Sequence, residues 1–188
     1  MADTASPSKR LTVRQFLEWE ERQPHKYELL DGLVRMMTGG TQDHGEIAGN
    51  IFAALHGKLR GKPCRPCNSD IKVLTAGAQS YYPDVSIDCG PRDGEATQAS
   101  RPTVIFEVFS KSTRQSDLES KLPNYKATPS IAQIVYVETD RMHLMVWRRG
   151  ADGWEETEIA HPEEPLVIET VGVALTLADI YEDATFTG

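Results

Sequence analysis

The hydrophobic positions of this chain follow a helical period in one stretch and form short continuous runs in others. The helical stretch covers residues 43–60, where apolar side chains recur at helical spacing: Ile47, Ile51, Ala54, Leu55 and Leu59. Apolar runs predict strands at residues 70–74, 84–88, 103–109, 134–138, 142–148 and 166–169. Two further short runs flank Asp31-Gly32, a pair that strongly indicates a β-hairpin.

Local end signals predict three more helices. A T-x-x-Q capping box at Thr12 predicts a short helix that begins there. An S-x-x-E box at Ser116 predicts another. Pro123 falls inside that helix and should bend or end it, because proline lacks the N–H that the helix needs. A last short helix is predicted at residues 177–181.

The order helix, hairpin, helix, strands, helix, strands predicts one mixed α/β domain with a central sheet. The length of 188 residues fits a single domain. Residues 1–10 are small and polar and are expected to be disordered, which leaves residues 11–188 for the domain.

The net charge limits the choice of partners. With 20 basic and 28 acidic residues, the formal charge is −8, which argues against a protein that coats nucleic acid non-specifically. The charge does not exclude an enzyme that contacts DNA locally. Basic groups that could relieve the repulsion are Lys9-Arg10, Lys58-Arg60-Lys62 and Arg148-Arg149.

The cysteines and the N-terminus favour a cytoplasmic protein. Three cysteines do not suit a disulfide framework, and no secretory signal is visible at the N-terminus. Cys64 and Cys67 form a C-x-x-C pair that follows a helix and lacks partner ligands for zinc. We therefore expect both to be free thiols without metal.

The acidic residue with the most informative surroundings is Glu107. Its neighbours in residues 103–109 are apolar or β-branched, which predicts a strand covered on both faces. A carboxylate there is costly unless it is paired, hydrogen-bonded or bound to a metal. A structural ion pair explains it as well as a catalytic role does.

A second acid could join it. Asp84 follows Pro83 at the start of another apolar strand, and on its own it reads as a turn residue. If the two strands are neighbours, Asp84 and Glu107 meet at the sheet edge. Two hard oxygen ligands, with waters and a substrate phosphate, are what Mg²⁺ prefers.

Lys121 and Tyr125 share one face of the helix predicted from Ser116, because they are four residues apart. An amine near a metal-bound carboxylate can orient a water or stabilise charge on a phosphate. Taken alone, Lys121 reads as a surface lysine paired with Asp117 one turn earlier.

Together these segments resemble a known family. The ordered set is YELLDG at residues 27–32, His44, PDV at 83–85, EVFSKSTR at 107–114, then Asp117, Lys121 and Tyr125. It is similar to the Uma-type family of bacterial restriction endonucleases, over roughly residues 10–180. The resemblance implies a PD-(D/E)XK restriction endonuclease-like fold, in which a central mixed β-sheet is flanked by helices.

The resemblance also implies site roles. Asp84 and Glu107 would bind Mg²⁺ or Mn²⁺, with the carbonyl of Val108 as a further ligand. Glu28 would be the acidic residue of the N-terminal element. Phe109 occupies the usual lysine position, so the resemblance assigns the amine to Lys121, supported by Tyr125; Lys111 is a second candidate. His44 matches the family pattern and equally reads as a helix cap or surface histidine.

The resulting hypothesis is a metal-dependent phosphodiester hydrolase, an endonuclease acting on DNA. A non-catalytic binding module with the same fold is the alternative, and a small-molecule binding protein with buried acids is a weaker one. A homodimer is also predicted, through six apolar residues after residue 131 that the sheet could expose: Ile134, Val135, Val137, Leu144, Val146 and Trp147.

Overall fold

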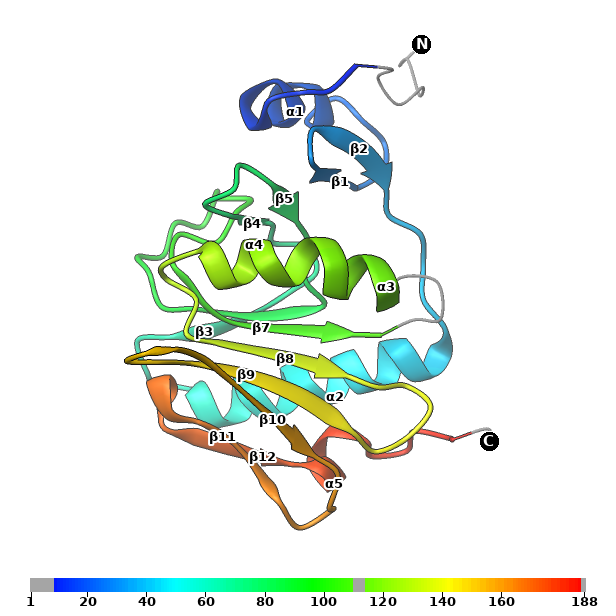
Figure 1. Cartoon of the computed structure of the whole chain (residues 1–188), viewed down its shortest axis with the longest axis vertical. Helices are drawn as coiled ribbons and strands as arrows, with labels where there is room; N and C mark the ends of the chain where they lie inside the picture. Colours follow the sequence, from blue (N-terminus) through cyan, green and yellow to red (C-terminus); the bar gives the residue numbers. More distant parts are fainter. Residues whose placement is uncertain (1–8, 110–113, 187–188) are drawn as a thin grey trace.

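Figure 1 shows the computed structural model of the chain, which describes residues 9–109 and 114–186. Of the segment predicted to be disordered, residues 1–10, the first eight lie outside the described residues, as does the alternative amine Lys111. No helix within those two ranges has the length and apolarity needed to cross a membrane.

The centre of the fold is a six-stranded sheet with the strand order β10-β9-β8-β7-β6-β3. Strands β7 and β8 are parallel, and every other neighbouring pair is antiparallel, so the predicted mixed sheet is confirmed. The strands are β3 (Arg65–Asn68), β6 (Val85–Asp88), β7 (Pro102–Val108), β8 (Gln133–Val137), β9 (Leu144–Gly150) and β10 (Gly153–Ile159).

Strand β7 lies inside the sheet, and all seven of its residues are buried. Val104 and Phe106 contribute to the core on one face of the sheet. Ile105 contributes to the core on the opposite face. Because side chains alternate along a strand, Glu107 points to the same face as Ile105.

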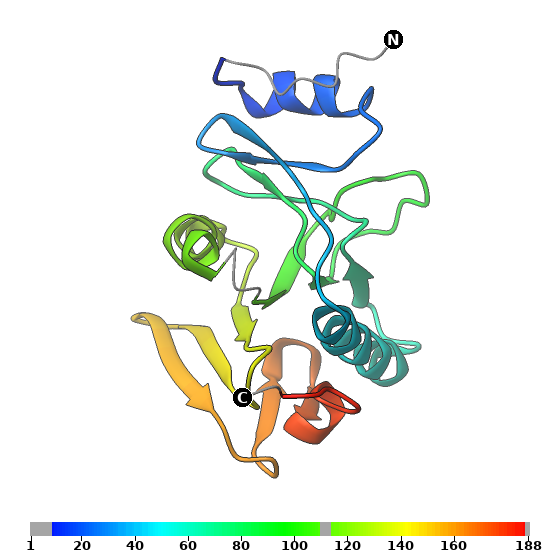
Figure 2. The ribbon, with the colours of Figure 1, turned by 90° about the vertical axis from the view of Figure 1, so that its right-hand side faces the viewer.

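Helical layers cover both faces, as Figure 2 shows. The 18-residue helix α2 (Gln42–Leu59) and the short helix α5 (Leu177–Ile180) cover one face of the main sheet. A small sheet of β11 (Pro165–Ile168) and β12 (Val173–Thr176) covers the same face, and the 3₁₀ turn η2 (Glu169–Val171) connects its two strands. The other face is covered by the crossover between β7 and β8. That crossover contains α3 (Arg114–Ser116), a π-helical turn η1 (Asp117–Lys121) and α4 (Leu122–Ala127).

A second sheet lies beyond the first, at the top of Figure 1, with the strand order β2-β1-β5-β4. Its strands are β1 (Tyr27–Leu30), β2 (Leu33–Met36), β4 (Val73–Leu74) and β5 (Ser80–Tyr81). The predicted Asp31-Gly32 hairpin joins β1 to β2, and Gly32 adopts the positive φ of 80° that glycine tolerates. Helix α1 (Val13–Glu20) covers this sheet and begins with the predicted capping box at Thr12.

One predicted helix start is wrong. The crossover helix begins at Arg114, so Ser116 lies inside helical backbone rather than opening the helix. Cys67 of the C-x-x-C pair lies within β3, a polar edge strand that the sequence pattern did not predict. Pro123 is the second residue of α4 and follows the π turn, which ends at Lys121, so the helical backbone changes from π to α just before the proline.

Of the strands after residue 131, β8, β9 and β10 extend the main sheet, as predicted, whereas β11 and β12 form a small sheet of their own. The six apolar residues on which the dimer prediction rested are buried within the single chain, each at most 3% exposed. They pack against the helical layers and do not form an exposed face. The homodimer therefore stays a prediction without this support.

The cysteine prediction is wrong for one residue of the pair. Cys64 forms a disulfide with Cys89, and Cys67 is the free cysteine. The spacing of 25 residues carries no local signal, but antiparallel pairing places Arg65 opposite Asp88, so the residues just outside that pair meet.

Thiol counting checks this pairing. Protein purified without reductant and then unfolded should react with one equivalent of a thiol reagent, from Cys67, because Cys64 and Cys89 are joined. Three equivalents would contradict the disulfide. The same protein unfolded after treatment with reductant should react with three equivalents and is the control.

The Asp88 carboxylate anchors the loop between β6 and β7. It accepts hydrogen bonds from the N–H groups of Gly90, Ser100 and Arg101 and pairs with Arg65. Burial raises the pKa of Asp88, but those N–H groups and the guanidinium together hold the pKa below its ordinary value of 3.8. A group whose pKa is lowered by folding stabilises the folded protein at pH values above the pKa that the group has in the unfolded chain.

Asp88→Asn should therefore lower the free energy of unfolding by about 1–3 kcal/mol at neutral pH. The difference from wild type should shrink as the pH falls below 3.8 and through the folded-state pKa, because the carboxylate is then protonated in both states. Urea unfolding across this pH range measures it. A difference independent of pH would contradict the ionic role.

Candidate active site

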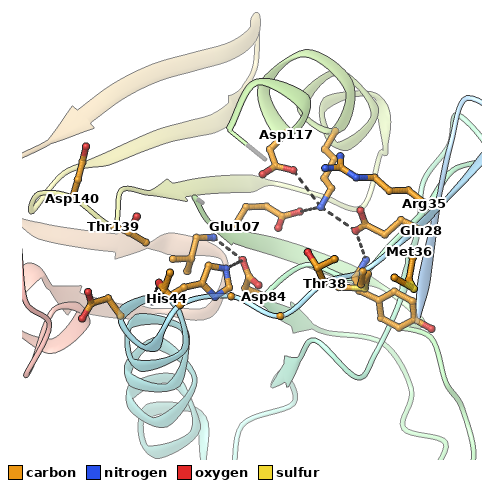
Figure 3. Close-up of a pocket in the computed structure, with 18 residues that line it drawn as sticks. Glu28, Arg35, Met36, Thr38, His44, Asp84, Glu107, Asp117, Thr139 and Asp140 are labelled. Carbon is orange, nitrogen blue, oxygen red and sulfur yellow. Dashed lines mark hydrogen bonds and ion pairs between the residues drawn. The ribbon is translucent and has the colours of Figure 1, made fainter. Parts of the chain in front are cut away.

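A cavity of about 560 Å³ opens where the two sheets meet the first turn of α2. The end of β7, the turn η1 and the residues after β2 form its walls. Of the predicted site residues, Glu28, Asp84, Glu107, Val108 and Lys121 all line it, and Tyr125 contacts it through Glu107. Figure 3 shows how Glu28, Glu107 and Asp117 point toward a shared centre.

Glu107 lies at the end of the central strand and is 3% exposed. Its Oε1 accepts a hydrogen bond from the Tyr125 hydroxyl at 2.7 Å and one from the Lys121 ammonium at 3.2 Å. Burial raises the pKa of Glu107 well above its ordinary value; Lys121 opposes this rise, whereas Asp117 and Asp84 add to it. The buried carboxylate is thus partnered, as its apolar strand requires.

Asp84 stands one residue before β6. Because Val85 pairs with Phe106, the antiparallel register brings Asp84 beside Glu107 on the neighbouring strand, as predicted. The Asp84 Oδ2 accepts a hydrogen bond from the Val108 N–H at 2.8 Å, which fixes the carboxylate against the end of β7.

His44 approaches Asp84 from the first turn of α2. Its Nε2 lies 3.4 Å from the Asp84 Oδ2, and the hydrogen bond to Asp84 raises the pKa of His44 despite the opposing effect of burial. Its backbone N–H is capped by the Thr41 hydroxyl. A Cβ on Gly40 would lie 2.7 Å from the His44 Nδ1, so a larger residue at that position would displace the imidazole from this orientation.

Glu28 reaches the cavity from the second sheet. It lies on β1 between Tyr27 and Leu29, whose side chains point to the α1 side, so Glu28 points the other way. Its Oε1 accepts the N–H of Tyr82 at 3.1 Å and forms an ion pair with the Lys121 Nζ at 2.9 Å.

Lys121 ends the π turn η1, and its ammonium lies among three carboxylates. The Nζ is 2.9 Å from Glu28, 3.2 Å from Glu107 and 3.4 Å from Asp117. Burial lowers the pKa of Lys121, but these three carboxylates together raise it well above its ordinary value, so the amine is charged. π turns are enriched at functional sites, and here the turn lies between β7 and Pro123.

A second buried network, which sequence reasoning missed, supports Glu28 from behind. The Glu20 carboxylate accepts the Tyr82 hydroxyl at 2.9 Å and the Lys72 ammonium at 2.7 Å, and all three side chains are buried. It holds in place the residue whose N–H binds Glu28. Nothing in the sequence marks Glu20 apart from its place on the last turn of a short helix.

The basic groups proposed from the sequence do not lie at the cavity. Lys58 and Lys62 are at the far end of α2 from His44, about 20 Å along the helix axis. Arg149 caps the carbonyls of Ile131 and Thr128 at the other end of the main sheet. The arginine that lines the cavity is Arg35, opposite Glu28 on β2.

The donor set fits a hard divalent cation in part. Residues 9–109 and 114–186 contain no ready group of three or more His, Cys, Asp or Glu side chains that could hold a metal ion. Mg²⁺, however, is usually bound through one or two carboxylates, with waters and substrate phosphate as its other ligands. Asp84 and Glu107 supply two carboxylates at one edge of the cavity.

Comparison with known proteins agrees with this fold. A crystal structure from Anabaena variabilis, titled a "putative nuclease belonging to DUF820", superposes with a TM-score of 0.71 at 16% identity, covering 91% of this chain and 97% of that one. The fold is therefore a nuclease-like mixed sheet flanked by helices. Two Synechocystis relatives, both described as uncharacterized, are slr1290 (29% identical, 97% of each chain) and sll1609 (25% identical, 70% of this chain and 76% of the relative).

Residues 13–178 match the Uma2 family, described as "Putative restriction endonuclease". The match spans most of the sequence, and the chain belongs to this family. The resemblance noted from the ordered motifs is thereby confirmed.

The Tyr125 hydroxyl provides a direct test of the site's packing. Tyr125→Phe should lower the free energy of unfolding by roughly 1–2 kcal/mol, because Glu107 loses a buried hydrogen-bond donor while the ring contact with Tyr81 is kept. Urea denaturation measures the change. Tyr27→Phe is the matched control, since that buried ring makes no hydroxyl hydrogen bond within the described residues; equal losses for both variants would contradict the role of the hydroxyl.

Proposed function

We propose that this protein is a metal-dependent phosphodiester hydrolase that acts on DNA as an endonuclease. The observation that carries the proposal is the convergence, in one cavity, of a carboxylate near the end of β7, a carboxylate just before β6 and a buried amine: Glu107, Asp84 and Lys121. Membership in a family described as "Putative restriction endonuclease" supports nucleic acid as the substrate.

The charge of the cavity favours a metal-dependent reaction. Its lining contains one lysine, one arginine, one histidine and six carboxylates: Glu28, Asp43, Asp84, Glu107, Asp117 and Asp140. Such a site repels a phosphodiester. A divalent cation on the carboxylates reverses the local field and makes phosphate binding favourable.

Asp84 and Glu107 would hold Mg²⁺ or Mn²⁺, with the Val108 carbonyl as the further ligand that the family resemblance implies. When bound, the cation supplies Lewis-acid polarisation of the phosphate and lowers the pKa of a bound water. The Val108 N–H keeps the Asp84 carboxylate oriented through its 2.8 Å hydrogen bond.

Lys121 supplies the amine. Its position at the end of a turn packed on the sheet fixes its direction, and its ammonium can position a water or stabilise charge that develops on the phosphate. Tyr125 and Glu28 hold Glu107 and Lys121, respectively, in the geometry described above.

Metal binding is the first test. Isothermal titration should show binding of Mn²⁺ or Mg²⁺ by the wild type that Glu107→Ala abolishes, because Glu107 is one of the two carboxylate ligands. Glu156→Ala, which removes an exposed acid on the outermost strand, should leave binding unchanged. Unchanged binding in Glu107→Ala would overturn the site assignment.

Cleavage is the second test. In a plasmid-nicking assay with Mg²⁺ or Mn²⁺, Lys121→Ala should lower the rate by about a hundredfold or more. Lys58→Ala, an exposed lysine at the far end of α2, should cut like the wild type. Lost cleavage in Lys111→Ala with retained cleavage in Lys121→Ala would move the amine to Lys111. A wild type that binds DNA and never cuts it would favour the binding module.

A further inference from the structure

The three carboxylates around the Lys121 ammonium are not equivalent. An ammonium has three N–H donors. Glu28 and Glu107 lie closest, at 2.9 and 3.2 Å, whereas Asp117 lies at 3.4 Å and its Oδ1 accepts no hydrogen bond from the described residues. The Asp117 side chain is 4% exposed.

A buried carboxylate oxygen without a hydrogen bond is expensive, and the backbone of Asp117 is held in place. Its own carbonyl accepts a hydrogen bond from the Tyr136 hydroxyl on β8 at 2.8 Å, which fixes the start of η1 on the sheet. Asp117 lines the cavity and lies one turn from Lys121. The acceptor capacity that remains on Asp117 thus faces the ammonium.

The other two carboxylates, of Glu28 and Glu107, also interact with groups other than Lys121. The Glu28 Oε1 that pairs with Lys121 also accepts the Tyr82 N–H. The Glu107 Oε1 also accepts the Tyr125 hydroxyl, and Glu107 is a carboxylate that the proposed function gives to the metal. A divalent cation on Glu107 and an ammonium 3.2 Å from the same oxygen repel each other, so Lys121 competes with the metal.

We propose that Asp117 is a positioning residue that draws the Lys121 ammonium away from Glu107, which leaves this carboxylate able to bind a divalent cation. The inference rests on the proposed function, because it takes Glu107 as a metal ligand. It assigns to Asp117 an action through Lys121, without contact between Asp117 and the metal or the substrate.

A double-mutant cycle on Mn²⁺ affinity tests the proposal. Isothermal titration would compare the wild type, Asp117→Asn, Lys121→Met and the double variant. Lys121→Met should bind Mn²⁺ more tightly, because the competing cation is gone. Asp117→Asn should weaken binding, with a loss at least about threefold larger in the wild-type background than in the Lys121→Met background.

Comparing the effect of Asp117→Asn with and without Lys121 separates a positioning effect from the direct electrostatic effect of the lost charge. Removing a nearby negative charge weakens cation binding whether or not Lys121 is present, whereas a positioning effect disappears with Lys121. Glu119→Gln is the matched control: it removes an exposed acid on the same turn, one that accepts a hydrogen bond from Gln115, and should change the affinity by less than about twofold.

The outcomes distinguish this inference from the function on which it rests. Equal losses for Asp117→Asn in both backgrounds, with binding that still depends on Glu107, overturn the inference alone. A wild type that binds no Mn²⁺ overturns the proposed function and this inference with it. Thermal unfolding monitors folding of each variant. If Asp117→Asn does not fold, Asp117→Ser replaces it. A Lys121→Met variant that binds Mn²⁺ no more tightly than the wild type also overturns the proposal.

Discussion

One buried ammonium holds the two sheets of this protein together at the candidate site. Lys121 pairs with Glu28 from the small sheet and with Glu107 from the main sheet, and its charge is the counterpart of both carboxylates. A buried charge is tolerated only with such partners, and removing one partner leaves the other uncompensated. Because Glu28 and Lys121 are 93 residues apart in the sequence (121 − 28), the cavity forms only in the folded chain.

The parallel pair β7–β8 explains why the amine is available at that point. A parallel connection requires a crossover, and here the crossover helix covers the face to which Glu107 points. The π turn before Pro123 sets where Lys121 and Asp117 lie on that helix. The excess of carboxylates around them gives the cavity the negative charge that the proposed divalent cation would neutralise.

Features with a local or periodic signal were predictable. The hairpin at Asp31, the cap at Thr12, the α2 helix and the buried strand around Glu107 all follow from spacing and turn chemistry, and the ordered motifs identified the family. Long-range or context-dependent features were not: the Cys64–Cys89 disulfide, the edge strand β3 and the Glu20–Lys72 pair depend on tertiary contacts. The catalytic and metal-binding roles of Asp84, Glu107 and Lys121 stay predictions, although the fold brings these residues into one cavity.

The central claim is that Asp84 and Glu107 share one divalent cation, and anomalous diffraction from crystals soaked in Mn²⁺ tests it most directly. The account predicts a single strong anomalous peak in the cavity, within coordination distance of both carboxylates. A peak bound elsewhere, with both carboxylates still engaged only by protein groups, would contradict it.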